Sequence, residues 1–498
     1  MIKLKILKIN INDKSKMVME KRETMRTKAI MIVSMLLLIT GVGSLYAQAE
    51  TYTLEKSINT ALQNNTELKV AVMRIDSAES VVDEYFGYAL PSLDFNASFS
   101  HFIQKPVMPF PDFETLLTNA TYNILFEEGL VQPFQLPPIE TKLQSFALAN
   151  NFSTELSLSQ VLFSSAVFRG IGASQVYKNI TQHQLKTTIA KTVNNVTSAF
   201  NGALLSKEML GILQDSYENA QRNYENLQSM YEQGLVSEYE LLQVEVHVEN
   251  LKPQIIDLEN SYQQAKDGLK MIMGIDPEVE INIEGELDYT DEELPDENRV
   301  VQSVMEDNYE LRTMRESIEL MDAFVDINRA DYWPTIAAFG SYQYAGQSDD
   351  LDFLTYNQTV VGVNLSLNLF NGFRTSNKVQ QAQIGKQQMI EQTNQFKDYL
   401  TSQVRKQILN IKKAKALLEA QERNVKLAKK AYDIAVTRYD NGEGTQLEIK
   451  NADMELRTAR TNRLQSIFDY INAKNELTRL TGNIKEEYLN KYRNKFTK

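Results

Sequence analysis

The sequence predicts an α+β membrane protein built from one unit written twice, in which two strand-like runs lead into two very long helices. Asn65 and Pro91 recur as Asn308 and Pro334, with the same shift of 243 residues. Further along the chain the shift is 208 residues, and it relates Tyr231, Gly234, Glu240 and Gly274 to Tyr439, Gly442, Glu448 and Gly482. Because the spacing is kept over long stretches, we interpret the match as a duplication.

The N-terminal residues carry a processing signal. Arg26 and Lys28 precede the apolar run 30–42, and Ala47 and Ala49 offer cleavage sites. The predicted organisation is an N-terminal extension with signal peptide (1–49), a first repeat (50–275), an acidic linker (276–297), a second repeat (298–482) and a C-terminal tail (483–498). The tail has no counterpart in the repeat, so we expect a flexible periplasmic end.

Charge and composition exclude several function classes. The formal net charge is −13, and it becomes −19 without residues 1–49, which hold nine Lys or Arg and three Asp or Glu. A chain this acidic argues against nucleic acid as a partner. The absence of cysteine excludes disulfides, thiol nucleophiles, cysteine-based metal sites and a lipid-modified cysteine. The three histidines, which are His101, His183 and His247, are far apart in the sequence. We therefore expect no enzyme, no cofactor and no metal site.

Four runs alternate apolar and small polar residues with the period of a β-strand. The alternation is regular in 361–370 and 93–100, weaker in 336–344, and interrupted by Gln160 in 152–163. These lengths suit tilted membrane strands of about 9–11 residues, although an amphipathic sheet on a soluble core would alternate in the same way. Four strands cannot close a barrel, which needs about eight. If the strands lie in lipid, several chains must therefore contribute to one barrel.

The helices carry coiled-coil seams. A 3-4 spacing of apolar residues runs through Leu210, Leu213, Tyr217, Ala220, Tyr224, Leu227 and Tyr231. The same pattern returns in 251–272 and in 425–439. The helix over about 182–232 would be roughly 75 Å long at 1.5 Å per residue. A rod of that length has no globular core, so we expect it to bury its seams against partner helices.

Two segments interrupt the repeat. The linker 276–297 is strongly acidic and contains a candidate strand, 281–283. The insertion 103–151 is rich in Pro and Phe, and we expect it to form an external loop or plug because it joins two strands of one hairpin. Gly170-Ile171-Gly172 lacks the lysine of a phosphate loop, so we interpret it as a strand-to-helix turn.

Over residues 53–482 the chain resembles the TolC family of outer-membrane efflux proteins. The resemblance rests on the order and doubled spacing of several short motifs, which are Thr53-Leu54-Glu55 with Ala61 and Asn65, Pro91-Ser92-Leu93, the run 365–372, Tyr231-x-x-Gly234 and Tyr439-x-x-Gly442. It implies a homotrimer in outer-membrane lipid, with a shared barrel of twelve strands, four from each chain, and a periplasmic coiled-coil tunnel. It also implies partnership with a periplasmic adaptor (membrane fusion) protein and an inner-membrane RND or ABC transporter.

The helix turns are the candidate gate. Ser237 with Glu240, and Thr445 with Glu448, match capping boxes, so both glutamates could serve helix initiation alone. The resemblance implies a closed periplasmic mouth, in which Glu240 bonds Tyr439. Glu443 and Glu448 in three copies would crowd carboxylates around the opening. The family's basic latch residue falls on Gly444, so that salt link is not expected.

The same turns are the candidate adaptor-docking tips. In the first tip, Gly234-Leu235-Val236-Ser237, we expect two exposed apolar residues, which suggests a partner that covers them. The second tip, Gly442-Glu443-Gly444-Thr445, has no apolar pair. We therefore expect the first tip to supply more of the apolar contact with an adaptor.

Together these features predict an outer-membrane exit duct of a tripartite efflux or type I secretion system, which passively conducts what a pump delivers. Two alternatives remain open from the sequence. A structural trimeric coiled-coil stalk or adhesin would be non-conducting, and it would not need seams on two faces of its helices. A soluble periplasmic adaptor would have one helical hairpin and a lipoyl-like β module. The sequence does not indicate the transported substrate.

Overall fold

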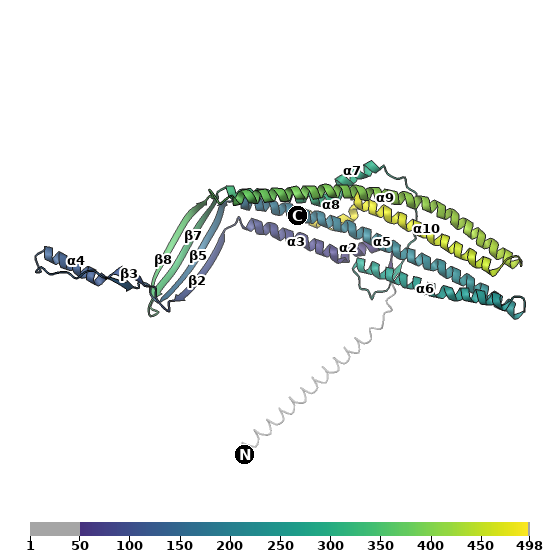
Figure 1. Ribbon diagram of the computed structural model, residues 1–498, viewed down its shortest axis with the longest axis horizontal. Helices are drawn as coiled ribbons and strands as arrows, with labels where there is room; N and C mark the ends of the chain where they lie inside the picture. The colour runs from purple at the N-terminus through teal and green to yellow at the C-terminus, as the bar shows by residue number, and fades with distance from the viewer. Residues whose placement is uncertain (1–49, 497–498) are drawn as a thin grey trace, which may run out of the picture. The chain divides into compact units, whose positions relative to one another are not determined.

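The computed structural model describes residues 50–496 (Figure 1), so the predicted signal peptide lies outside the described residues. The first copy consists of β1 (Glu50–Tyr52), α2 (Leu54–Asn64), α3 (Thr66–Gly87), β2 (Ser92–His101), β3 (Met108–Pro111), α4 (Phe113–Glu127), β4 (Thr141–Gln144), β5 (Asn150–Phe163), α5 (Ser165–Glu232) and α6 (Glu238–Met273). After β6 (Ile281–Ile283), the second copy consists of α7 (Glu297–Asp307), α8 (Tyr309–Arg329), η1 (Ala330–Tyr332), β7 (Thr335–Ser348), β8 (Leu354–Ser366), α9 (Arg374–Asp440) and α10 (Gln446–Leu480). The chain closes with α11 (Glu486–Asn490) and α12 (Arg493–Phe496).

The duplication extends to the lengths of the helices. Helices α5 and α9 have 68 and 67 residues, and α6 and α10 have 36 and 35. The chain divides into two compact units. Among the described residues, the tip unit consists of 50–68, Ile189–Pro295 and Arg405–Arg479, and the sheet unit consists of Lys69–Thr188, Asp296–Val404 and 480–496.

The sheet unit contains a four-stranded antiparallel sheet in the order β2-β5-β7-β8 (Figure 1). The four predicted strands are thus confirmed, but the last one ends at Ser366 and not at Phe370. Ser366 pairs with Thr335, and the next residue of β7 would be Pro334, which has no N–H to donate. The edge strands β2 and β8 each have one neighbour in this sheet, and nearly every residue in them is exposed.

One face of the sheet is apolar and open. The register places Leu93, Leu158, Gly340 and Val361 in one row across the four strands. Leu93 is 64% exposed and Val361 is 80% exposed, values far above those of a packed core. The opposite face carries small polar side chains such as Asn96, Ser98 and Ser157, as the alternation predicted. An exposed apolar face opposite a polar face is the arrangement of a strand set between lipid and water.

The tip unit holds the predicted coiled-coil seam. Leu213 and Ala220 of α5 are buried against Val248 and Leu251 of α6, with tyrosines and further aliphatic residues packed around them. Leu251 is 1% exposed. The two helices of this hairpin therefore bury their seams against each other, as the 3-4 spacing indicated.

An asparagine and a glycine join the end of the long hairpin to the short helices in each copy. In the sheet unit, Asn308 is 2% exposed; its Nδ2 donates to the carbonyl of Leu480 at 2.9 Å, and its Oδ1 accepts from the N–H of Leu311 at 2.9 Å. In the tip unit the same two bonds link Asn65 to Ile272 and Leu68. A Cβ on Gly482 would lie 2.5 Å from the carbonyl oxygen of Asp307, so the chain needs glycine there. These contacts explain why the Asn and Gly positions recur between the copies.

The prediction of a turn at Gly170-Ile171-Gly172 is wrong, because α5 already begins at Ser165 and runs through these residues. A Cβ on Gly170 would lie 2.7 Å from the Tyr85 ring. The Tyr85 ring of α3 thus packs directly on the backbone of α5 at Gly170, and the glycine does not mark a change of chain direction.

The acidic linker lies against the second hairpin in the tip unit. Its predicted strand is confirmed as β6, which pairs in parallel with β1, a strand that the sequence did not indicate. Asp291 and Glu292 form ion pairs with Lys415 of α9 and Lys474 of α10, at 2.5 Å and 2.6 Å. Burial and a hydrogen bond to Asp291 raise the pKa of Tyr289 to about 12. The acidic residues of the linker thus fasten it to the lysines of the long helices.

The C-terminal tail is folded, which corrects the expectation of a flexible end. Tyr488 is 5% exposed, and Lys495 forms an ion pair with Asp76 of α3 at 2.5 Å. The carbonyl of Lys495 also accepts from the Gln182 side chain of α5. The tail therefore packs on α3 and α5 within the sheet unit.

The insertion between β2 and β5 is an ordered hairpin and not an irregular loop. Strands β3 and β4 pair antiparallel, and α4 connects them (Figure 1). Its stem is attached to the β7–β8 turn, where Asp349 pairs with Lys105 and accepts from the N–H of Ala149. Many of its apolar side chains are exposed, including Phe134 at 69% and Ile124 at 62%.

Candidate functional site at the helix tips

The first tip is a tight turn between α5 and α6. Gly234 has φ +73, and the N–H of Leu235 donates to the carbonyl of Met230 at 2.9 Å. At the start of α6, the Ser237 hydroxyl accepts from the N–H of Glu240 at 3.3 Å, and the Glu240 carboxylate accepts from the N–H of Ser237 at 3.4 Å. The predicted capping box is thus confirmed, and Glu240 initiates the helix.

The second tip keeps only half of its predicted capping box. The Thr445 hydroxyl accepts from the N–H of Glu448 at 3.3 Å. The carboxylate of Glu448, however, pairs with Arg438 of α9 at 3.1 Å instead of returning to the N-cap. Arg438 also donates to the carbonyl of Glu443 at 2.9 Å. Arg438 therefore neutralises the charge of Glu448 within the chain. This pairing weakens the expectation that Glu443 and Glu448 of three copies place unpaired carboxylates around an opening.

The second tip has no room for a side chain at Gly444. A Cβ there would lie 2.9 Å from the backbone nitrogen of Tyr439. Gly442 has φ +75, and its N–H donates to the carbonyl of Tyr439 at 2.8 Å. Close packing of the turn therefore leaves no space at Gly444 for the basic side chain that the family has there. This agrees with the expectation that the salt link is absent.

The two tips differ in apolar exposure. Leu235 is 66% exposed, and Tyr239 in the first turn of α6 is 69% exposed. Val236, which we expected to be exposed, is half-buried. At the second tip, Glu443 occupies the position of Leu235 and is exposed. The first tip thus exposes one apolar residue of the turn, Leu235, and not the expected pair of Leu235 and Val236. Tyr239 is exposed close to it.

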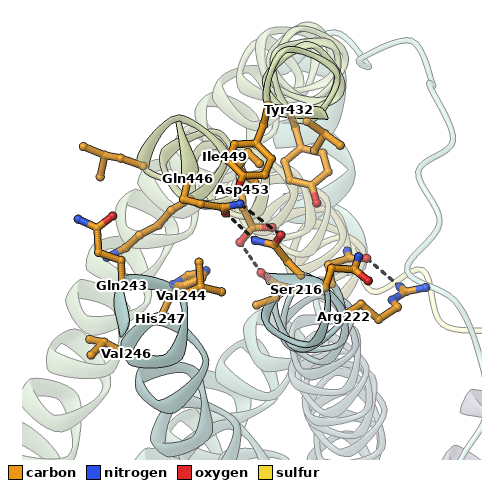
Figure 2. Close-up of a pocket in the computed structure, with 18 of the residues that line it drawn as sticks. Ser216, Arg222, Gln243, Val244, Val246, His247, Tyr432, Gln446, Ile449 and Asp453 are labelled. Carbon is orange, nitrogen blue, oxygen red and sulfur yellow. Dashed lines mark hydrogen bonds between the residues drawn. The ribbon is translucent and has the colours of Figure 1, made fainter. Parts of the chain in front are cut away.

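A cavity of about 590 Å³ lies behind the tips, between the α5–α6 and α9–α10 hairpins (Figure 2). Two polar pairs join α5 to α10 beside it. The hydroxyl of Ser216 donates to the Asp453 carboxylate, and Asn223 donates to the Oε1 of Gln446 at 2.7 Å. Burial lowers the pKa of His247, which lines the cavity, and so favours the neutral imidazole.

Tyr439 also lines this cavity, whereas Glu240 is occupied by its capping box. Within residues 50–496, the structure records no hydrogen bond between these two side chains. The polar contacts recorded here are those of Ser216 with Asp453, Asn223 with Gln446 and Arg438 with Glu448. The sequence analysis did not single out Ser216, Asn223 or Arg438. The available signal was weak, since these polar residues stand beside apolar seam positions without any motif.

No group of three His, Cys, Asp or Glu in residues 50–496 could hold a metal ion. No helix among the described residues is long and apolar enough to cross a membrane.

Comparison with known proteins identifies the family. The family model described as outer membrane efflux protein matches residues 143–275 and 300–483, which is more than half of the chain. The chain is 23% identical over 332 residues to the alkaline protease secretion protein AprF of Pseudomonas aeruginosa, covering 65% of this chain and 68% of AprF. It is 20% identical over 339 residues to the outer membrane protein TolC of Vibrio cholerae, covering 67% of this chain and 77% of TolC.

The fold agrees with this assignment. The crystal structure of the Campylobacter jejuni CmeC outer membrane channel matches with a TM-score of 0.70 at 18% identity, covering 89% of each chain. The relatives are channel proteins, which favours the duct over the stalk or adhesin, and the exposed apolar face of the sheet fits lipid. This chain belongs to the outer membrane efflux protein family and is an outer-membrane channel whose helical part extends into the periplasm.

Proposed function

We propose that three copies of this chain assemble into one exit duct, with a twelve-stranded barrel in the outer membrane and a helical tunnel in the periplasm. The observation that carries this proposal is the four-stranded sheet with two open edges and one exposed apolar face. Open edges leave backbone groups unpaired, and lipid cannot satisfy them. If β8 of one chain pairs with β2 of the next, three chains close the sheet.

We propose further that an inner-membrane RND or ABC transporter supplies the energy and that a periplasmic adaptor connects it to the tips. The similarity to a protein named for alkaline protease secretion supports secreted proteins as one class of cargo. The first tip, with Leu235 and Tyr239 exposed, supports an apolar contact with the adaptor.

A planar lipid bilayer tests conduction directly. The purified protein is expected to insert and to conduct ions in uniform steps, because a closed barrel continues into a hollow tunnel. A protein that inserts as a stable oligomer and shows no conductance would instead support the non-conducting stalk.

Gate residues are tested in the same bilayer. We propose Glu240, Tyr439, Glu443 and Glu448 as gate residues. The single chain does not record the Tyr439–Glu240 bond, so we propose that it forms only in the closed, assembled duct. Tyr439→Phe combined with Glu240→Ala is then expected to raise the open population roughly fivefold, because one hydrogen bond contributes about 1 kcal/mol. Control recordings use Glu240→Gln, which keeps a side-chain oxygen for the helix cap. Unchanged conductance of the double variant would show that no Tyr439–Glu240 bond holds the duct closed.

Adaptor docking is tested by charge at the first tip. Leu235→Asp is expected to abolish export while the oligomer stays intact, because a carboxylate in an apolar contact is left without a partner. Ser229→Asp, which adds the same charge to an exposed position of α5 away from the turn, is the matched control and should leave export unchanged. The assay measures the exported cargo and, in the same cells, the amount of oligomer. Full export by Leu235→Asp would contradict docking through this residue.

A further inference from the structure

Helix α4 of the insertion packs with its polar side inward. Asn119 is 8% exposed, and its amide donates to the carbonyl of Pro137 at 2.9 Å. The Tyr122 hydroxyl donates to the carbonyl of Gln132, and Thr115 is half-buried on the same side of the helix. A helix that turns its polar residues toward its own domain reverses the usual amphipathic arrangement.

The opposite side of α4 carries an exposed apolar seam, which consists of Phe113, Leu117, Ala120 and Ile124. The steps between these residues are 4-3-4, which is the spacing of a coiled coil. Phe113 is 56% exposed, Leu117 57% and Ile124 62%. An apolar stripe with this spacing fits along a helix that carries the same spacing.

The insertion lies where neighbouring copies of the proposed duct meet. Helix α3 leads into β2 at Ser92, and β2 ends toward the insertion at His101, so the insertion lies at the end of the sheet remote from α3 (Figure 1). In the duct, the edge strand β2 pairs with β8 of the next copy. Lys105 and the N–H of Ala149 fasten the stem to Asp349 in the β7–β8 turn. Three insertions therefore surround one mouth, where tethering gives an effective concentration of about millimolar.

Area and charge favour other copies of α4 as the occupants of the seam. Phe113, Leu117 and Ile124 together expose roughly 300 Å² per copy, if each offers about 200 Å² when extended. Three copies would bury about 900 Å², close to the 1,000 Å² or so of a specific contact. Residues 103–151 hold five Asp or Glu and two Lys, and both lysines are in ion pairs, at 2.5 and 2.6 Å. The insertion therefore offers no free lysine to the phosphates of a lipid surface.

We propose that the α4 helices of three copies pack seam to seam into a parallel bundle that covers the external mouth of the duct. This proposal rests on the three-chain assembly and gives the insertion a role outside the membrane. A three-fold axis keeps the helices parallel and in register, so each Leu117 faces Leu117 of the other two copies. The next position of the spacing is Glu127, so the apolar contact ends after about three turns.

The cysteine-free sequence allows a direct test by disulfide formation in the full-length protein extracted into detergent. Leu117→Cys and, separately, Ala120→Cys are expected to give covalent dimers on mild oxidation, because the bundle brings their Cα atoms within about 7 Å of each other. Covalent trimers are not expected, since three identical cysteines form a single disulfide. Thr118→Cys, which is exposed on the same helix but turned away from the seam, is the matched control and should give no covalent dimer.

A charge in the seam tests the packing itself. Leu117→Asp, added to the Ala120→Cys protein, is expected to lower the yield of covalent dimer roughly tenfold, because three carboxylates would meet in a contact closed to water. Thr118→Asp adds the same charge one residue further along and should leave the yield unchanged. Both substitutions replace exposed residues, so neither removes a contact on which the insertion depends for its fold.

Access to the barrel interior reports on the cover. Ser98→Cys places a cysteine on the polar face of the sheet, near the end of β2 that leads to the insertion. A maleimide carrying a long polyethylene glycol chain, added to whole cells, should label this cysteine slowly. Leu117→Asp is expected to raise the labelling rate roughly tenfold, whereas Thr118→Asp should not. An unchanged rate in both variants would overturn the role as a cover.

The remaining outcomes separate the bundle from the duct. Failure of both seam cysteines to form dimers, in particles that still show three-fold symmetry, would overturn the bundle and leave the duct standing. Equal dimer yields for Leu117→Cys and Thr118→Cys would also overturn it, because the insertions would then meet through no preferred face. A seam cysteine that is shielded from water-soluble thiol reagents in membranes, yet forms no dimer, would assign the seam to lipid. The absence of three-chain particles for the parent protein would overturn the duct itself.

Discussion

Arginine in place of Val363 is expected to keep the protein out of the outer membrane. Val363 belongs to β8, on the apolar face of the sheet, and is 66% exposed in the single chain. A cation on the lipid face of a barrel costs up to about 2–4 kcal/mol depending on its depth, and three copies would contribute roughly three times that cost. The measurement is the amount of oligomer recovered from outer-membrane fractions, compared with total protein.

The neighbouring residue supplies the control. Asn364 is the next residue of the same strand, so its side chain points to the opposite, polar face. Asn364→Arg should therefore assemble normally, although it adds the same charge to the same strand. If both variants assembled equally well, the apolar face would not be the lipid-facing surface.

Alanine in place of Gly482 is expected to destabilise the protein far more than alanine in place of Gly442. Both glycines have positive φ, at +68 and +75, so both substitutions place a side chain in the left-handed region at a cost of about 1–2 kcal/mol. Only at Gly482 does the new Cβ also meet backbone, 2.5 Å from the carbonyl oxygen of Asp307, whereas nothing lies within 4 Å at Gly442. The difference in unfolding free energy between Gly482→Ala and Gly442→Ala therefore reports the cost of this close contact alone.

The clash at Gly482 would push α10 away from Asn308, whose bond to the Leu480 carbonyl holds the junction. Loss of that buried bond adds about 1–3 kcal/mol to the destabilisation, because the Asn308 amide is then left without a hydrogen-bond partner. Heating the detergent-extracted protein while recording helical ellipticity measures the effect, and the midpoint of Gly482→Ala is expected well below that of Gly442→Ala. Equal midpoints would show that the junction tolerates movement of α10.

The sequence predicted those parts of the fold that depend on periodicity. The alternation in 361–370 and the 3-4 spacing of Leu213 and Ala220 each follow from burial on one face, which a single chain records directly. The duplication helped as well, because Asn308 and Gly482 repeat positions of the first copy. Their role in joining α10 to α7 and α8 needed coordinates, since it depends on contacts between distant segments.

Errors arose where local signals competed with contacts that the sequence does not show. Gly170 suggested a turn, yet it serves the packing of Tyr85. Glu448 fitted a capping box, but Arg438, ten residues earlier, competes successfully for its carboxylate. The tail lacked a repeat partner, yet Tyr488 is buried on the sheet unit. In each case a contact with another helix decided the outcome.

Electron microscopy of the detergent-extracted protein shows whether three copies enclose a continuous passage. Averaged views along the long axis should show a three-fold hollow ring, and side views a wide barrel that continues into a tapering rod. A solid three-stranded rod, or particles with the mass of a single chain, would contradict the account, because the open edges of β2 and β8 would then close no barrel.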